Sequence, residues 1–233
     1  MSASQLPLAL APPRRPAFDN FVAGENRAVL RTLRDGPAPG DWFFLSGPPG
    51  SGKTHLAQAC VRGWSGPGRP VAFVPGSSPR AADLLRATSG QRVIVDDVDA
   101  LAGSSEGERA LFNALVRWQA ERCGVLMTGK SRRDFELPDL ASRVSRAARL
   151  VLRPLGDAGL ERLIDRLVAD HDVVAGRGLV AYLLRHGPRS GGELARLFER
   201  MSLRARSERR VLSVPLARSV LESFENDGAI GGM

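Results

Sequence analysis

The sequence has 233 residues, a formal net charge of +8 and no apolar run close to the roughly 20 residues that a membrane-spanning helix needs. This length accommodates one sizeable core, or a core with a smaller satellite, and the composition excludes a membrane-embedded protein. The N-terminus lacks the charged start and apolar stretch of a secretory signal, so we expect a cytoplasmic protein in which Cys60 and Cys123 are reduced and buried.

Positive charge comes almost entirely from arginine, because lysine occurs only at positions 53 and 130. An excess of arginine is typical of proteins that contact nucleic acid or an acidic partner. It also arises when arginine replaces lysine on solvated helix faces, and no dense basic run decides between the two. Charge alone therefore leaves the function open.

From residue 17 onward, short apolar runs alternate with helical patterns. The strand-like runs lie at 42–45, 71–74, 93–95, 124–127 and 149–152, and helical patterns lie between them at 53–62, 80–87 and 106–122. Ser105 and Glu108 are predicted to form a capping box at the start of the last of these helices. The alternation predicts an α/β fold with a five-stranded parallel sheet that is covered by helices on both faces.

After Pro154 the strand patterns stop, and helical patterns follow at 157–169, 177–185, 192–206 and 214–224. Asp157 is predicted to cap the first of them. We therefore expect an extended tail over 1–16, an α/β domain over 17–153, a small all-helical domain over 154–226 and a disordered tail over 227–233.

The first predicted strand is followed by a complete phosphate-binding loop, Gly47-Pro48-Pro49-Gly50-Ser51-Gly52-Lys53-Thr54. Its glycines let backbone N–H groups face phosphate oxygens, Lys53 reaches the β- and γ-phosphates, and Thr54 offers its hydroxyl to Mg²⁺. A plain glycine-rich turn would not require the Lys-Thr pair. The loop predicts binding of a nucleoside di- or triphosphate.

The predicted strand 93–95 runs into the paired carboxylates Asp96 and Asp97. Carboxylates at a strand end suit the Mg²⁺ of a bound nucleotide, with Asp96 as the metal partner through water. Asp97 would polarise the attacking water, although an aspartate reaches less far than the glutamate often found at such positions. A strand-ending turn also contains such pairs, but the order after the phosphate loop favours the nucleotide role.

Together these motifs resemble the AAA+ ATPases, in the branch of the replication initiator DnaA, and the resemblance runs from Gln5 to about Glu222. The family begins with a conserved box that lies beside the adenine, and the matching segment here is Phe18-Asp19-Asn20-Phe21-Val22-x-Gly24-x-Asn26. The Walker A loop continues through His55 and Leu56, 93–97 resembles Walker B, and Val125-Leu126-Met127-Thr128-Gly129 resembles the sensor 1 strand. The resemblance implies an AAA+ module with a helical lid that binds ADP or ATP and Mg²⁺, with nucleotide contacts from Phe21, Val22, the loop, His55 and Thr128.

The family's arginine-finger box is resembled by the segment Leu137-Pro138-Asp139-Leu140-Ala141-Ser142-Arg143. This resemblance implies that Arg143 acts in trans on a partner's nucleotide. On spacing alone, Arg143 would be an ordinary surface arginine. Gly192 departs from the family, because relatives usually have at this position a lid arginine called sensor 2. Arg189 or Arg196 could reach the phosphates in its place. This departure predicts slow hydrolysis by the chain itself, or ADP held as a structural ligand.

The tail segment Gln5-Leu6-Pro7-Leu8-Ala9-Leu10 resembles the peptide with which replication proteins dock on the sliding clamp, Gln5, Leu6, Leu8 and Leu10 being its contact residues. An incidental apolar patch is the alternative. The sequence ends soon after the helical domain, so we expect no helix-turn-helix domain for duplex DNA. Only residues 76–92 separate two predicted strands, which leaves no room for the extra helix that grips single strands in initiators and helicase loaders.

The resemblance therefore implies a regulator that docks on the DNA-loaded clamp of DNA polymerase III, stimulates hydrolysis of ATP bound to DnaA and prevents over-initiation of replication. It would contact DNA indirectly, associate with the nucleoid through the replisome and hydrolyse little ATP itself. The alternatives are an AAA+ helicase loader or DNA-remodelling ATPase, and a passive clamp-tethered adaptor. A homo-oligomer or a mixed filament with the initiator also stays open.

Overall fold

The computed structural model describes residues 15–130, 135–171, 173–208 and 210–230, the last stretch with side chains through Phe224. A five-stranded sheet lies at its centre, formed by β1 (Trp42–Ser46), β2 (Val71–Pro75), β3 (Arg92–Asp96), β4 (Gly124–Gly129) and β5 (Ala148–Val151). All neighbouring strands pair in parallel, in the order β2-β3-β4-β1-β5. The predicted parallel sheet is confirmed.

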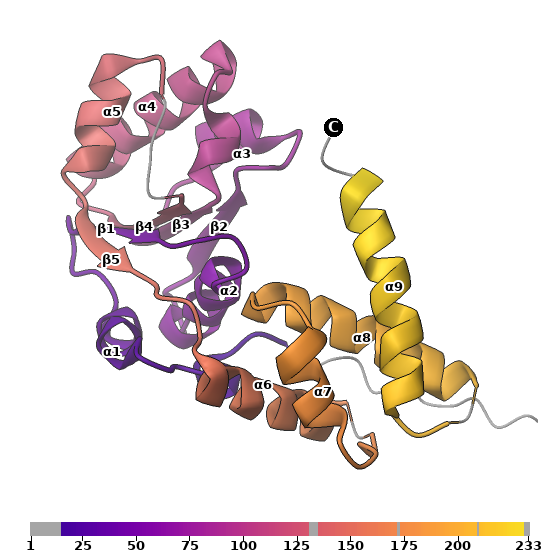
Figure 1. Ribbon diagram of the computed structural model, residues 1–233. Helices are drawn as coiled ribbons and strands as arrows, with labels where there is room; N and C mark the ends of the chain where they lie inside the picture. The colour runs from indigo at the N-terminus through magenta and orange to yellow at the C-terminus, as the bar shows by residue number, and fades with distance from the viewer. Residues whose placement is uncertain (1–14, 131–134, 172, 209, 231–233) are drawn as a thin grey trace, which may run out of the picture.

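Helices cover both faces of the sheet (Figure 1). One face carries α1 (Arg27–Asp35) and α2 (Lys53–Trp64), and the other carries α3 (Ala81–Ala87), α4 (Ser105–Ala120) and α5 (Pro138–Ser145). Neighbouring strand residues point to opposite faces: Phe44 belongs to the core under α3, α4 and α5, and Leu45 to the core under α1 and α2. Burial on both faces explains why the strands read as continuous apolar runs.

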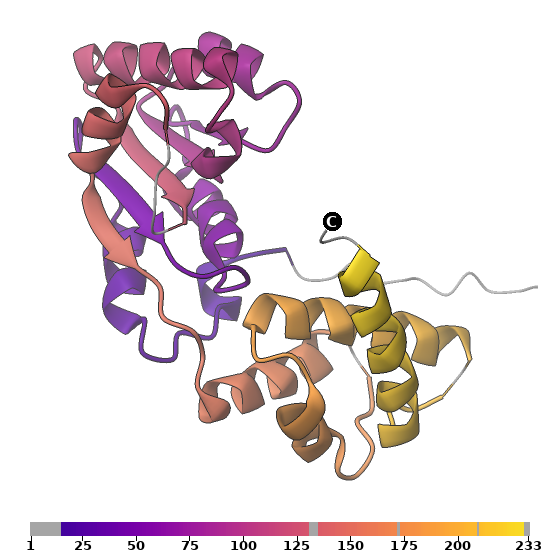
Figure 2. The ribbon, with the colours of Figure 1, turned by 45° about the horizontal axis from the view of Figure 1, so that its top comes forward.

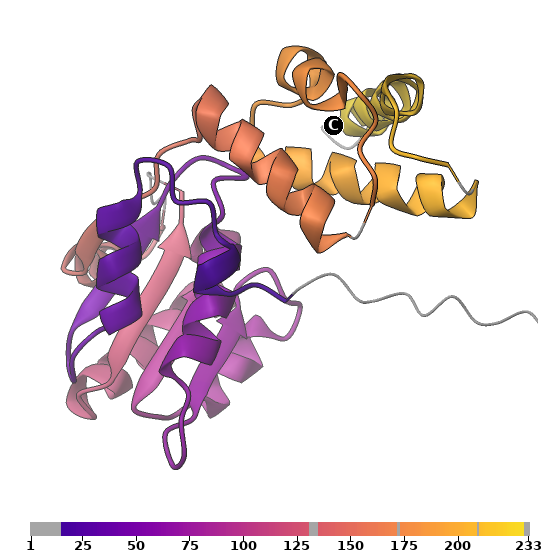
Figure 3. The same ribbon diagram turned by 90° about the horizontal axis from the view of Figure 1, so that it is seen from below.

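A separate helical part, called the lid below, consists of α6 (Asp157–Asp170), α7 (Leu179–His186), α8 (Gly191–Ser207) and α9 (Val214–Ile230). It has its own core, in which Leu197 and Phe198 of α8 are fully buried. Figures 2 and 3 show the lid beside the α/β part, reached by the passage of the chain from β5 into α6. The predicted boundary at residues 153 and 154 falls within this passage.

Two predicted helix caps are wrong. The N-cap of α4 is Ser104, whose Oγ accepts a hydrogen bond from the Gly107 N–H at 3.1 Å, and Glu108 bonds other backbone groups instead of completing a box with Ser105. Two adjacent serines offer the same capping chemistry, and the sequence pattern selected the wrong one. The N-cap of α6 is Gly156, while Asp157 is the first helical residue and pairs with Arg189.

Several boundaries also differ from those predicted. The helix α1 and the short 3₁₀ helices Phe18–Asn20 and Val98–Leu101 were not predicted. The helix α9 continues to Ile230, so the predicted tail over 227–233 is wrong for residues 227–230. A glycine inside a helix costs only about 1 kcal/mol, so Gly228 does not by itself end one. Residues 231–233 and the predicted clamp-binding residues Gln5, Leu6, Leu8 and Leu10 lie outside the described ranges.

Candidate nucleotide site

The phosphate-binding loop connects β1 to α2 at the carboxyl end of the strand, as its motif requires. Gly50 and Gly52 have φ angles of 70° and 95°, which residues other than glycine rarely adopt. A Cβ on Gly52 would lie 2.6 Å from the Phe21 ring. The turn therefore requires glycine at both positions, and at Gly52 the close approach of the opening segment requires it as well.

Lys53 is folded back onto its own loop. Its Nζ donates hydrogen bonds to the carbonyl oxygens of Gly47 and Pro48, at 3.0 and 3.1 Å. Burial lowers the pKa of Lys53, although Asp97, Asp99 and Asp96 oppose this shift by attraction. The buried Ser51 hydroxyl has no hydrogen-bond partner among the described residues. A loop with a cation turned inward and an unsatisfied hydroxyl fits a phosphate group.

Thr128 of β4 connects the ends of β3 and β4 through hydrogen bonds. Its Oγ1 donates to Asp96 Oδ1 at 2.5 Å and accepts from the Asp97 N–H at 2.9 Å. Asp96 and Thr128 are both buried, and Asp97 has left-handed backbone angles, φ 56° and ψ 58°. The hydroxyl for which the resemblance implies a nucleotide contact orients Asp96 and holds the turn at Asp97 in this structure. The structure brings together these three predicted site residues.

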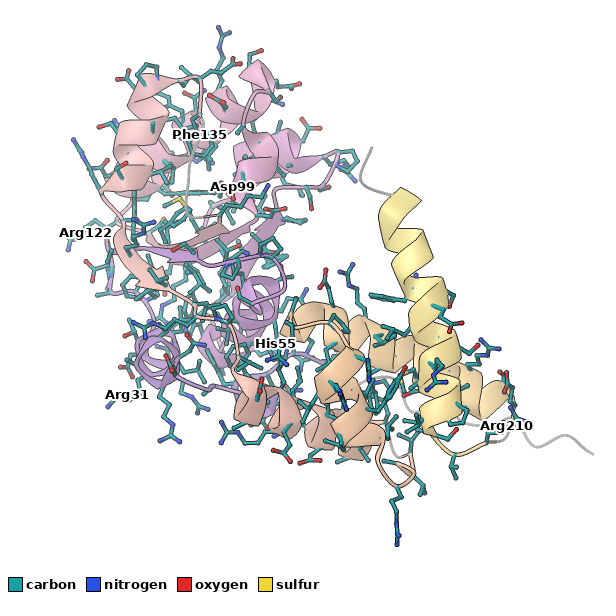
Figure 4. All side chains as sticks on the ribbon, viewed as in Figure 1. Arg31, His55, Asp99, Arg122, Phe135 and Arg210 are labelled. Atoms are coloured by element: carbon teal, nitrogen blue, oxygen red, sulfur yellow. The ribbon has the colours of Figure 1, made fainter. Side chains whose placement is uncertain are left out.

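Asp99 is a third carboxylate in this region that sequence reasoning missed. It lies in the 3₁₀ helix after Asp97, accepts a hydrogen bond from the Lys130 N–H, and packs against Gly129, where a Cβ would meet its Oδ2 at 2.6 Å. Figure 4 labels its position. Burial raises the pKa of Asp99, and the Lys130 hydrogen bond opposes this shift. Its position two residues after Asp97 was the feature of the sequence that could have identified it as a further carboxylate of this site.

A pocket of about 530 Å³ lies between the α/β part and the lid. From the predicted site it is lined by Phe21, Val22, His55 and the loop residues Pro48–Gly52, and lid helices α6 and α8 supply the opposite wall. The rings of Phe21 and His55 lie 5.5 Å apart, and His55 Nε2 lies 3.1 Å from the Ala17 carbonyl oxygen. Burial lowers the pKa of His55, so the ring is neutral at pH 7 and donates to that oxygen. The pocket thus has an apolar wall beside the phosphate loop.

The lid touches the phosphate loop through backbone. The Gly192 N–H donates to the Gly50 carbonyl oxygen at 2.9 Å, and a Cβ on Gly192 would lie 2.8 Å from Gly50 Cα. A side chain at residue 192, where the resemblance predicts the sensor 2 arginine, would therefore disturb this backbone contact. Arg189 pairs with Asp157 and Arg196 lies 3.9 Å from Glu193, while both line the pocket.

Arg143 lies in α5, away from the residues that line this pocket. Its Nη1 donates to Gln119 Oε1 at 2.6 Å, and the guanidinium carbon lies 5.2 Å from the centre of the Phe112 ring. Both partners belong to α4. The predicted finger is thus held on the sheet face opposite α2.

Residues 43–155 match the family model described as "ATPase family associated with various cellular activities (AAA)". This match runs from β1 to the passage into α6 and covers just under half of the chain. Domain III of the Thermotoga maritima initiator DnaA is similar in structure, with a TM-score of 0.75, 17% identity, and coverage of 91% of this chain and 98% of that one. A DnaA bound to AMPPCP and single-stranded DNA gives a TM-score of 0.67, 18% identity, and coverage of 86% and 70%.

A RuvB variant from Thermotoga maritima gives a TM-score of 0.63 with 20% identity, over 90% of this chain and 72% of that one. At these identities the likeness establishes the fold, and the predicted AAA+ fold class is confirmed. No helix within the described ranges is long and apolar enough to span a membrane. Those ranges also contain no cluster of three or more histidine, cysteine or acidic side chains able to hold a metal ion.

Proposed function

We propose that this AAA+ protein is a regulator of replication initiation that resembles Hda, the regulatory inactivator of DnaA. The observation that carries the proposal is the finger-box arginine, Arg143, which is held on α5 by neutral partners and lies apart from the chain's own pocket. A guanidinium in that position is available to the nucleotide of a neighbouring molecule. The fold shared with DnaA domain III supports the pairing of two similar modules.

The chain's own site would hold ADP or ATP with Mg²⁺. The loop Gly47–Thr54 would bind the phosphates, and Phe21 and Val22 would face the adenine across the pocket from the lid. Thr54 and Asp96 would hold Mg²⁺ together with phosphate oxygens. With Gly192 at the sensor 2 position, the bound nucleotide would be turned over slowly, and Asp97 would be the residue that acts on the attacking water.

The proposed partners are the initiator DnaA and the sliding clamp of DNA polymerase III. Gln5, Leu6, Leu8 and Leu10 would dock in an apolar groove of the DNA-loaded clamp, so that DNA is contacted indirectly. Arg143 would then reach the γ-phosphate of ATP bound to DnaA and stabilise charge that develops during hydrolysis. Such a finger accelerates hydrolysis by about 10³ to 10⁵ in other nucleotide switches.

The test follows labelled ATP bound to DnaA in the presence of DNA-loaded clamp and this chain. Three further chains are compared: Arg143→Ala, the matched control Arg146→Ala at the end of the same helix, and a chain without residues 5–10. We expect conversion to ADP with the intact chain and with Arg146→Ala, and loss of conversion with Arg143→Ala and with the shortened chain.

Two results would contradict this proposal. Normal stimulation by Arg143→Ala, with loss only in the shortened chain, would support a passive clamp-tethered adaptor. No stimulation by the intact chain, together with tight single-strand binding at moderate salt, would support a helicase loader or DNA-remodelling ATPase.

A further inference from the structure

One face of α4 meets the segment that carries Arg143. Glu108, Phe112 and Gln119 are separated by four and seven residues, so they lie along the same side of the helix. Each of them contacts the chain between Glu136 and Arg143. Figure 1 shows α5 lying against α4. These three residues are called the α4 cradle below.

Glu108 fixes where α5 begins. Its side chain is 1% exposed, and its two oxygens accept three backbone hydrogen bonds. Oε1 accepts from the N–H groups of Gly103 and Glu136, at 2.9 and 3.0 Å, and Oε2 accepts from Leu137 at 2.8 Å. Leu137 is the N-cap of α5 and offers no side-chain cap of its own. The buried carboxylate therefore anchors the first turn of α5 to α4, and with it the position of Arg143 one and a half turns later.

Phe112 and Gln119 hold the guanidinium of Arg143 without neutralising it. The amide oxygen of Gln119 is a neutral acceptor, and the Phe112 ring attracts a cation through its face. The guanidinium has five N–H donors, and Gln119 accepts from only one nitrogen, so most donors remain available to a phosphate. No carboxylate among the described residues pairs with Arg143.

Some other arginines of the chain pair with carboxylates. Arg86 pairs with Asp83 and Glu106, and Arg153 pairs with Glu25. A carboxylate partner offsets the positive charge and would compete with an incoming phosphate for the same donors. The cradle thus gives Arg143 what a finger acting in trans requires, a fixed direction together with an uncompensated charge.

We propose that Gln119 and Phe112 are positioning residues for Arg143, which they hold in the orientation used on the partner's nucleotide, while Glu108 sets the start of its helix. This inference rests on the proposed function and adds to it the residues that prepare the finger. It assigns to Gln119 a role that its exposure on a helix surface would not suggest.

The test compares Gln119→Leu and Phe112→Leu in the assay of initiator-bound ATP, at saturating concentrations of the chain. Loss of one neutral hydrogen bond corresponds to about a fivefold change, so we expect the maximal stimulated rate to fall about fivefold in Gln119→Leu. The concentration for half-maximal stimulation should stay unchanged, because the docking proposed above uses residues 5–10 of the tail. Gln58→Leu, which also removes an exposed amide from a helix, is the matched control and should behave like the intact chain.

A double-mutant cycle separates positioning from a general structural effect. In an Arg143→Ala background, Gln119→Leu should have no further effect, because the group it positions is gone. Gln119→Glu should also lower the maximal rate, since it keeps an acceptor but pairs the guanidinium charge. Equal rates for Gln119→Leu and the intact chain, with Arg143→Ala inactive, would overturn the inference and leave the proposed function standing.

A second measurement does not depend on the partner. Side-chain ¹⁵N relaxation of Arg143 in the isolated chain should show a more mobile Nε–H in Gln119→Leu than in the intact chain or in Gln58→Leu. Unchanged mobility would overturn the inference whatever the hydrolysis assay gives. A chain that fails to stimulate DnaA at all would instead remove the proposed function.

Discussion

At the scale of single residues, the hydroxyl of Thr128 links the carboxylate of Asp96, the last residue of β3, to the backbone N–H of Asp97. It fixes the orientation of the Asp96 side chain and satisfies the N–H of Asp97. A non-glycine residue in left-handed conformation costs about 1–3 kcal/mol, and such residues persist where their surroundings hold them. The hydrogen bond from the Asp97 N–H to Thr128 therefore helps to hold Asp97 in its strained conformation beside the phosphate loop.

Replacing Thr128 by valine keeps the shape of the side chain and removes both hydrogen bonds. The buried Asp96 carboxylate and the Asp97 N–H would lose their partner, so we expect a loss of about 1–3 kcal/mol in the free energy of unfolding, measured by urea denaturation. Thr128→Ser should recover most of this loss. Thr32→Val removes a hydroxyl from exposed α1 and serves as the control. Equal midpoints for Thr128→Val and Thr32→Val would contradict the assigned role.

Sequence reasoning located the residues of the phosphate loop because their function depends on local geometry. Loop, strand and helix are adjacent in the chain, so the motif contains most of the information needed. The roles of Glu108 and Gln119 were not predictable in this way. Glu108 bonds Glu136 and Leu137, and Gln119 bonds Arg143, so their meaning depends on how two helices pack.

At the scale of elements, Glu108 controls the junction of α4 and α5. Burial alone would raise its pKa, but the hydrogen bonds from Glu136, Gly103 and Leu137 outweigh burial and lower the pKa below its ordinary value of 4.5. A carboxyl group whose pKa is lowered by folding stabilises the folded state above its ordinary pKa. This stabilisation is lost as the pH falls through the lowered value.

Glu108→Gln should therefore destabilise the protein in a pH-dependent manner. One acceptor oxygen becomes an NH₂ group facing the Leu137 N–H, which should cost about 1–3 kcal/mol at pH 7. The difference in free energy of unfolding between the two proteins should stay constant above about pH 5 and shrink below pH 4.5, where the intact carboxyl group begins to take up a proton. Urea denaturation at several pH values measures this difference in free energy of unfolding. A difference that grows at low pH would refute the role assigned to the Glu108 carboxylate.

Elements with strong periodicity or a motif were predicted, and elements stabilised by few contacts were not. The helix α1 has only nine residues and buries only Leu30 and Leu33, so its apolar pattern covers few positions. The caps at Ser104 and Gly156 were missed because neighbouring residues have similar capping chemistry. Tertiary packing decides where such helices begin and end, and the packing cannot be inferred from a single sequence.

At the scale of the whole molecule, the lid and the α/β part meet at two glycines. Gly50 and Gly192 approach closely enough to exclude any side chain on either residue, and a Cβ on Gly50 would collide with Ser190. The lid therefore contacts the phosphate loop directly. A change in the shape of the loop when nucleotide binds would reach α8 through this backbone contact.

Gly192→Ala should open this contact, while its neighbour provides a matched control. A Cβ on Gly192 would meet loop backbone at 2.8 Å, whereas a Cβ on Gly191 would meet the Leu163 side chain at 3.3 Å, which is able to move. Overpacking costs about 1–3 kcal/mol, so we expect ADP to bind about tenfold more weakly to Gly192→Ala and almost normally to Gly191→Ala. Titration with a fluorescent ADP analogue measures both, and equal affinities would show that the contact does not matter for binding.

The separate cores also determine what spectroscopy reports. Trp42, Trp64 and Trp118 are the chain's three tryptophans, all in the α/β part, and the lid contains the chain's one tyrosine, Tyr182. Indole emission therefore follows the α/β part alone, whereas far-ultraviolet circular dichroism also records the lid helices. Heating curves recorded with both signals would coincide if the glycine contact couples the two cores. If the lid melts first, the ellipticity would fall while the emission stayed constant.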